Sequence, residues 1–143
     1  MKHEFLEFIP DKLQEGVIYI SIPYATVAHK CACGCGNEVI TPLSPTDWKL
    51  TFDGESVTLF PSLGNWSFDC RSHYWITNNR IEWSYQLSES EIRDGRILDK
   101  LNKTTYYQDY IASEPRVVAN EGTSKGTQRR WRISWRRVKR WFS

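Results

Sequence analysis

Four cysteines and one histidine carry the metal-binding chemistry of this 143-residue chain. Cys31, Cys33 and Cys35 fall within five residues, and Cys70 stands three positions before His73. Thiolates and imidazole are ligands that zinc prefers, and two short ligand groups separated by a longer stretch are typical of small zinc domains. The sequence therefore predicts a zinc site whose ligands come from these five side chains.

The candidate ligands outnumber the four positions of a tetrahedral zinc ion, so the ligand set stays open. Cys31 and Cys33 point to the same face if they continue a strand, and the glycines that flank Cys35 allow that residue to turn inward. His29 is a sixth candidate, although we favour a structural role for it. The alternative for His73 is a core histidine with satisfied hydrogen bonds.

The residues around the predicted zinc indicate whether its role is catalytic or structural. A catalytic zinc needs an open coordination position and a nearby general base, for which Glu38 and Asp69 are the closest acids in sequence. The chain lacks the two-histidine helix motif of zinc hydrolases and the His-x-Glu signature of zinc deaminases. We therefore favour a structural zinc over a catalytic one.

Two other uses of the thiols are less favoured. The three early cysteines are too close in sequence to bridge one another without strain. Cys70 could therefore form a disulfide with only one of the three, and the other two thiols would remain free. A cysteine nucleophile that pairs with His73 is the other enzyme hypothesis. It is weakly supported because nothing in the sequence marks a third group that would orient the histidine.

Runs of β-branched and aromatic residues predict the strands that position the ligands. The stretches that read as extended are residues 16–22, 24–30, 38–41, 48–52, 56–60, 74–77 and 81–83. The Asp53-Gly54 and Asn78-Asn79 dipeptides each predict the turn of an antiparallel hairpin. Because the second stretch leads directly into the cysteines, we expect the metal at the end of a strand.

Beyond Trp83 the pattern changes from strand to helix. Ser88 and Glu91 have the spacing of a capping box, whereas Gly95 weakens the helix that follows. Its loose apolar face consists of Ile92, Ile97, Leu98 and Leu101. The predicted class is α+β, a small β-rich zinc-binding domain of antiparallel hairpins with C-terminal helical elements, over residues 1–114.

The charge of the chain is uneven. The net charge is +2, but eight of the 19 Lys and Arg residues lie from Lys125 onward, where there is no acid. Residues 115–126 read as a linker, and residues 127–143 as a basic, Trp-rich amphipathic helix. The candidate partner-binding residues of this tail are Arg129, Arg130, Trp131, Arg132, Trp135, Arg136, Arg137, Lys139 and Arg140.

Three partners suit such a tail. Arginines can clamp phosphates while indoles stack on bases, which would bind single-stranded nucleic acid. The same pattern suits an anionic membrane surface. The interpretation we favour is that the tail packs on the body of the protein, because the preceding residues carry 11 basic and 17 acidic side chains.

The composition of the chain indicates the class of protein and its cellular compartment. Apolar residues make up 40% of the chain and aromatic residues 14%, which indicates a folded globular protein. No apolar run approaches the ~20 residues of a transmembrane helix, and the start lacks the order of a secretory signal. We therefore expect a cytoplasmic protein, in which clustered thiols are more often metal-bound than oxidised.

Three motifs give the chain a resemblance to a known family. They are the cysteine motif of residues 29–36, the Pro-Ser motif of residues 61–66 and the Cys-to-His motif of residues 70–76. In this order and spacing, residues 19–85 resemble the bacterial domain-of-unknown-function family sixty-five twenty-seven. The resemblance implies zinc binding through the five candidate ligands, and partners among bacterial ubiquitin-like conjugation proteins.

The sequence thus favours a non-enzymatic zinc-binding accessory or adaptor protein, linked to a bacterial ubiquitin-like modification or defence system. One alternative is a nucleic-acid-binding zinc protein that uses the basic tail. The other is a zinc hydrolase or peptidase that acts on ubiquitin-like conjugates. An open metal position with a carboxylate within reach would favour the hydrolase.

Overall fold

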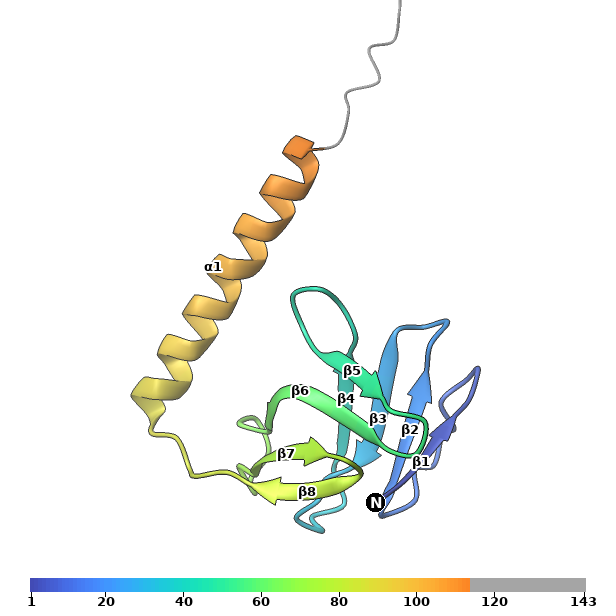
Figure 1. Ribbon diagram of the computed structural model, residues 1–143. Coiled ribbons are helices and arrows are strands. Elements are labelled where there is room, and N and C mark those ends of the chain that lie inside the picture. Colours follow the sequence, from blue (N-terminus) through green and yellow to red (C-terminus); the bar gives the residue numbers. More distant parts are fainter. Residues whose placement is uncertain (114–143) are drawn as a thin grey trace, which may run out of the picture. The chain divides into compact units, whose positions relative to one another are not determined.

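The computed structural model describes residues 1–113 of the chain, which form two four-stranded sheets and one helix (Figure 1). The first sheet consists of β1 (Lys2–Phe5), β2 (Val17–Ser21), β3 (Thr26–Lys30) and β4 (Glu38–Pro42), in that order. The second consists of β5 (Lys49–Phe52), β6 (Val57–Gly64), β7 (His73–Thr77) and β8 (Arg80–Trp83), and helix α1 (Glu89–Ser113) follows. These residues are therefore mostly β. The predicted linker 115–126 and basic tail 127–143 lie outside the described residues.

The first sheet combines the three predicted strands with one that the sequence did not indicate. β2, β3 and β4 pair antiparallel, and their bounds match the predicted extended stretches. β1 instead pairs parallel to β2, so the sheet is mixed and not built from antiparallel hairpins alone. Its sequence, Lys-His-Glu-Phe, has no β-branched residue and little burial, which explains why no pattern revealed it.

The second sheet contains both predicted hairpins. Asn78 and Asn79 have φ angles of 49° and 62°, the left-handed conformation that a tight type I′ turn requires. Gly54 has a φ angle of 100° in the turn between β5 and β6. The side chain of Asn79 also accepts a hydrogen bond from the backbone N–H of Val57 at 3.0 Å, which ties the two hairpins together.

Both sheets contribute to one hydrophobic core. The buried side chains of this core from the first sheet and the residue after it are Ile18, Ile20, Val27, Cys31 and Val39. Those from the second sheet are Val57, Leu59, Leu63, Tyr74 and Ile76. The two sheets therefore bury one face each against the other, and the segment that contains Cys31 lies at the edge of this shared core.

Helix α1 begins with the predicted capping box. The backbone N–H of Ser88 donates to Glu91 Oε2 at 2.8 Å, and the backbone N–H of Glu91 donates to Ser88 Oγ at 3.3 Å. Ile92 is the buried residue of the helix, whereas Ile97 and Leu101 are more than half exposed. Residues 1–113 contain no helix that is long and apolar enough to cross a membrane.

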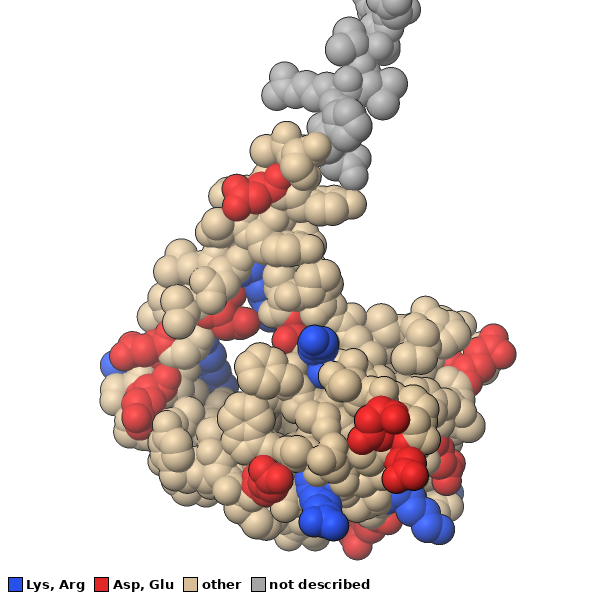
Figure 2. All heavy atoms as spheres, viewed as in Figure 1, with Lys and Arg blue, Asp and Glu red and all other residues tan. Residues whose placement is uncertain are grey.

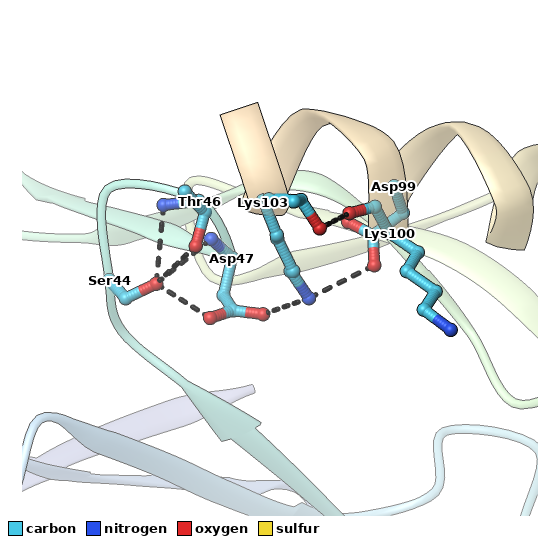
Figure 3. Close-up of polar contacts among 7 residues, drawn as sticks. Ser44, Thr46, Asp47, Asp99, Lys100 and Lys103 are labelled. Atoms are coloured by element: carbon cyan, nitrogen blue, oxygen red, sulfur yellow. Dashed lines mark hydrogen bonds and ion pairs between the residues drawn. The ribbon is translucent and has the colours of Figure 1, made fainter. Parts of the chain in front are cut away.

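Ion pairs attach the start and the middle of α1 to two connections between strands. Glu89 pairs with Arg71, and Lys103 Nζ lies 2.6 Å from Asp47 Oδ1 (Figure 3). Lys103 also pairs with Asp99 at 3.0 Å on its own helix, and Ser44 Oγ donates to Asp47 Oδ2 at 2.6 Å. These hydrogen bonds lower the pKa of Asp47, so its carboxylate stays charged opposite the lysine.

We predict that Ile76→Ala destabilises the protein by about 2 to 5 kcal/mol, because Ile76 is fully buried where the two sheets meet. The matched control is Ile22→Ala, at a side chain that is 59% exposed, for which we expect a change within about 0.5 kcal/mol. Urea unfolding of both variants measures the difference. Equal stability of the two variants would contradict a core shared between the sheets.

Candidate functional site

The sulfur atoms of the four cysteines lie close together. All four Sγ atoms, of Cys31, Cys33, Cys35 and Cys70, are within 4.8 Å of one another. The distances are 3.4 Å from Cys31 to Cys33, 3.9 Å from Cys31 to Cys70 and 3.6 Å from Cys35 to Cys70. A tetrahedral zinc with Zn–S bonds of about 2.3 Å separates its sulfur ligands by about 3.8 Å. This cysteine cluster therefore fits a zinc ion, and none of its thiols forms a disulfide.

Two connections between strands supply the cysteine cluster. The connection from β3 to β4 carries Cys31, Cys33 and Cys35, and the one from β6 to β7 carries Cys70. Gly34 and the glycine two positions later have φ angles of 82° and 80°, which allow the backbone to curl around the sulfur atoms as the sequence predicted. A metal bound here would join the first sheet to the second.

Polar groups contact the thiols of Cys31 and Cys35, whereas desolvation raises the pKa of Cys33 to about 12. The hydroxyl of Ser72 lies 3.0 Å from Cys31 Sγ, and Asn65 Nδ2 donates to the same hydroxyl at 2.9 Å. The backbone N–H of Asn37, helped by its side-chain amide at 3.2 Å, lowers the pKa of Cys35 to about 6. Such donors are typical of the groups that orient metal-bound thiolates. Four thiols also leave no open coordination position, which fits a structural zinc.

Neither histidine that the sequence offered as a ligand belongs to the cysteine cluster. The Nε2 atom of His29 lies 2.8 Å from the hydroxyl of Tyr74, and burial lowers the pKa of His29 to about 4, so the ring is neutral. His73 has a different environment. Its two ring nitrogens contact Ser62 and the backbone of Tyr85.

Ser62 and His73 form a hydrogen-bonded pair with the residue types of a nucleophile and a base. Nε2 of His73 lies 2.9 Å from Ser62 Oγ, and Nδ1 lies 2.9 Å from the carbonyl oxygen of Tyr85. A carbonyl oxygen only accepts hydrogen bonds, so Nδ1 carries the proton and Nε2 presents a lone pair. The Ser62 hydroxyl therefore donates to Nε2, which is the arrangement that activates a serine for attack.

Strand β6 turns Ser62 toward His73 through an irregularity in its pairing. Leu59 pairs with Ile76 and Leu63 with Tyr74, so β6 uses four positions where β7 uses two. Such bulges redirect side chains and are common beside active sites. Ser62 lies within this irregular stretch, and the Trp48 indole donates to its carbonyl oxygen at 3.4 Å.

Aromatic rings hold the imidazole of His73. The centroid of the Trp66 ring lies 4.9 Å from that of the imidazole and the centroid of the Tyr85 ring 6.2 Å from it, at interplanar angles of 60° and 70°. Trp66 reaches this position because residue 64 is glycine, where an added Cβ would lie 2.4 Å from the indole nitrogen. The rings restrict the rotation of the imidazole and keep it against Ser62.

A cavity of about 420 Å³ opens in front of the Ser62–His73 pair. One side comes from the second sheet and the loop that precedes it, with Thr46, Asp47, Trp48, Pro61, Ser62, Gly64, Trp66 and His73. The other side comes from the start of the helix and the residue before it, with Leu87, Glu91, Ile92, Gly95, Arg96, Asp99 and Lys103. Ser62 and His73 therefore both line one cavity.

Sequence reasoning did not identify Ser62. Its surroundings, Phe-Pro-Ser-Leu-Gly, lack the G-x-S-x-G pattern of the α/β-hydrolase nucleophile. The candidate base, His73, had instead been assigned to the metal. The signal that was available is that the Pro-Ser motif and the Cys-to-His motif occur together in the resemblance, and that their ends lie on adjacent strands.

These features define a small, mostly β protein with a cluster of four cysteines that fits a metal ion and a separate serine and histidine pair. The model of a family described as "Bacterial ubiquitination-like system serine protease (BubE)" matches residues 5–84, and the chain belongs to this family. Searches of curated proteins and of solved structures gave no match. The family supports the association with bacterial ubiquitin-like systems that the sequence resemblance implied.

We predict that Cys70→Ala lowers the zinc content of the purified protein from about one ion per chain to near zero, because it removes one of four ligands. The matched control is His73→Ala, which should keep its zinc since its ring contacts Ser62 and Tyr85. Metal analysis by mass spectrometry measures both. Equal loss of zinc in the two variants would place His73 among the ligands.

Proposed function

We propose that this protein is a serine protease of a bacterial ubiquitin-like system, with Ser62 as the nucleophile and His73 as the general base. The observation that supports this most directly is the 2.9 Å contact between Ser62 Oγ and His73 Nε2. The family of the chain, which is described as a serine protease family, supports the same chemistry. The proposed substrate class is a ubiquitin-like precursor or conjugate.

The reaction follows from the position of the protons. Ser62 Oγ attacks the carbonyl carbon of the scissile amide while Nε2 of His73 accepts the hydroxyl proton. The same nitrogen then donates this proton to the leaving amine as the C–N bond breaks. Water, deprotonated by His73, hydrolyses the acyl-serine, and Nε2 returns the proton to Ser62 Oγ.

The backbone carbonyl of Tyr85 replaces the carboxylate of a serine, histidine and aspartate triad. It fixes the tautomer of His73 as an aspartate does, through a 2.9 Å hydrogen bond from Nδ1. It carries a dipole and no full charge, so it stabilises the imidazolium of the transition state less strongly. This difference suits an enzyme that cleaves a few specific bonds, where substrate binding contributes much of the rate.

The cysteine cluster has a supporting role in this proposal. Three of its cysteines lie in the connection between β3 and β4, and Cys70 lies in the connection between β6 and β7, the strands that carry the proposed nucleophile and base. A closed four-thiolate zinc has no position for water or substrate, so it would stabilise this connection and not take part in the reaction.

The proposal takes up the peptidase alternative from the sequence and changes its chemistry from zinc to serine. It also replaces the cysteine nucleophile, because the side chain that His73 contacts is a serine. The adaptor hypothesis remains the chief competitor. It differs in expecting that Ser62 is unreactive and that its substitution leaves the biological function unchanged.

We predict that Ser62→Ala lowers the cleavage rate of a ubiquitin-like conjugate from the same bacterial system by roughly 10,000-fold, because the nucleophile is removed. An alkyl fluorophosphonate should label the unmodified protein at Ser62 and fail to label the variant. The matched control is Ser67→Ala, an exposed serine five residues away, which should retain activity and labelling.

Two results would reject the proposed protease. Absence of fluorophosphonate labelling together with absence of cleavage in the unmodified protein would favour the adaptor. Full activity of Ser62→Ala that is lost at once on zinc chelation would favour the zinc hydrolase. Intact zinc content in Ser62→Ala would show that a loss of activity does not arise from a disrupted cysteine cluster.

A further inference from the structure

Helix α1 stands opposite the Ser62–His73 pair across an open space. Figure 2 shows this space between the helix and the rest of the described residues. The family match ends at residue 84, before the helix begins at Glu89, so the family model does not account for this side of the cavity. The helix is nevertheless well placed to contact whatever reaches the serine.

We infer that helix α1 is the second wall of the substrate groove and that Gly95 is a specificity-determining residue, which admits an extended polypeptide segment between the helix and Ser62. This inference rests on the proposed protease function, because it takes the Ser62–His73 pair as the reacting groups. It adds a binding surface and a residue that determines which substrates fit.

The helix residues that line the cavity have the spacing of one helical face. They are Glu91, Ile92, Gly95, Arg96, Asp99 and Lys103, which recur at intervals of three and four positions. From the first to the last of them the helix rises by about 18 Å, at 1.5 Å per residue. An extended chain covers that distance with about five residues, at 3.3 Å each. The wall therefore has the length of a short peptide segment.

Gly95 leaves free space at the centre of this face. A Cβ added there would have no heavy atom within 4 Å, and its backbone is helical with a negative φ. Glycine weakens a helix interior, so local stability does not explain its presence. The missing side chain instead widens the groove at the level where the substrate main chain would pass.

The wall is fixed by contacts near both ends and one buried side chain. Arg71 pairs with Glu89 at the start of the helix. About four turns later, Asp47 pairs with Lys103 (Figure 3). Ile92 is buried between them at 5% exposure. Helix contacts at these three places leave the stretch around Gly95 open for a substrate.

The lining favours a polypeptide over a purely apolar ligand. Trp48 and Trp66 offer flat surfaces for side chains, while Glu91 and Arg96 on the helix offer a hydrogen-bond acceptor and donors. Among residues 1–113, Arg96 has no carboxylate within ion-pair distance, so its guanidinium can donate to substrate carbonyl groups. Main-chain amides and mixed side chains match such a surface.

The test compares two reagents that modify Ser62, an alkyl fluorophosphonate without peptide contacts and an acetyl-trialanyl diphenyl phosphonate that must lie in the groove. We expect Gly95→Leu to slow inactivation by the trialanyl reagent roughly tenfold, with Gly95→Ala in between, because added carbons occupy the peptide's space. The rate with the alkyl reagent should stay within about twofold. Both variants should be at least as thermally stable as the unmodified protein, since alanine and leucine favour helices more than glycine does.

The control is Asp94→Leu, a change of similar size at the preceding helix position, which does not line the cavity. It should leave both rates unchanged. Equal slowing of both reagents by Gly95→Leu, or no slowing of either, would overturn the groove while leaving the Ser62 nucleophile intact. If neither reagent modifies the unmodified protein, the proposed protease fails and the groove fails with it.

Discussion

The antiparallel pairing of β6 with β7 is the constraint on which the site depends. Gly64 pairs with His73, and the irregular pairing one step earlier turns Ser62 to the same face. Two residues that are eleven positions apart thus meet without a long excursion of the chain. The short connection between them also carries Cys70, so one supersecondary unit supplies Ser62, His73 and one cysteine of the cluster.

A buried polar network links this unit to the first sheet. The hydroxyl of Tyr74 accepts hydrogen bonds from the Asn65 side chain at 3.4 Å and from the backbone N–H of Ala32 at 3.5 Å, which leaves its own proton for His29 at 2.8 Å. Burial lowers the pKa of the histidine and raises that of the tyrosine, so both stay neutral. These hydrogen bonds favour one arrangement of the three side chains, although Nδ1 of His29 is buried without a hydrogen-bond partner among the described residues. Asn65 also donates a hydrogen bond to Ser72, the residue before His73. The network therefore extends from the first sheet to the residue beside His73.

Local patterns in the sequence predicted most of the fold and half of the site. Alternation, the Asn78-Asn79 turn and the capping box each depend on neighbouring residues, and the structure confirms them. The clustered thiols were visible because zinc ligands occur close together in sequence. Strand β1 was missed because its pairing comes from a distant partner, and Ser62 because a serine acquires reactivity only from a base placed beside it by the fold. Assigning His73 to the metal hid this second role.

The different roles that we propose for the cysteine thiols and for the Ser62 hydroxyl have a physical basis. A thiolate is the stronger nucleophile, but four thiolates that share a cation lose that reactivity and gain a fixed geometry. The hydroxyl of Ser62 is inert without a base, so its proposed reactivity depends on its contact with His73. In the proposed enzyme, helix α1 would add a surface opposite the serine that distinguishes one polypeptide from another. Ser62 and His73 lie within the family-matched residues and the helix lies beyond them, so a change in the helix alone would direct the proposed chemistry to a different substrate.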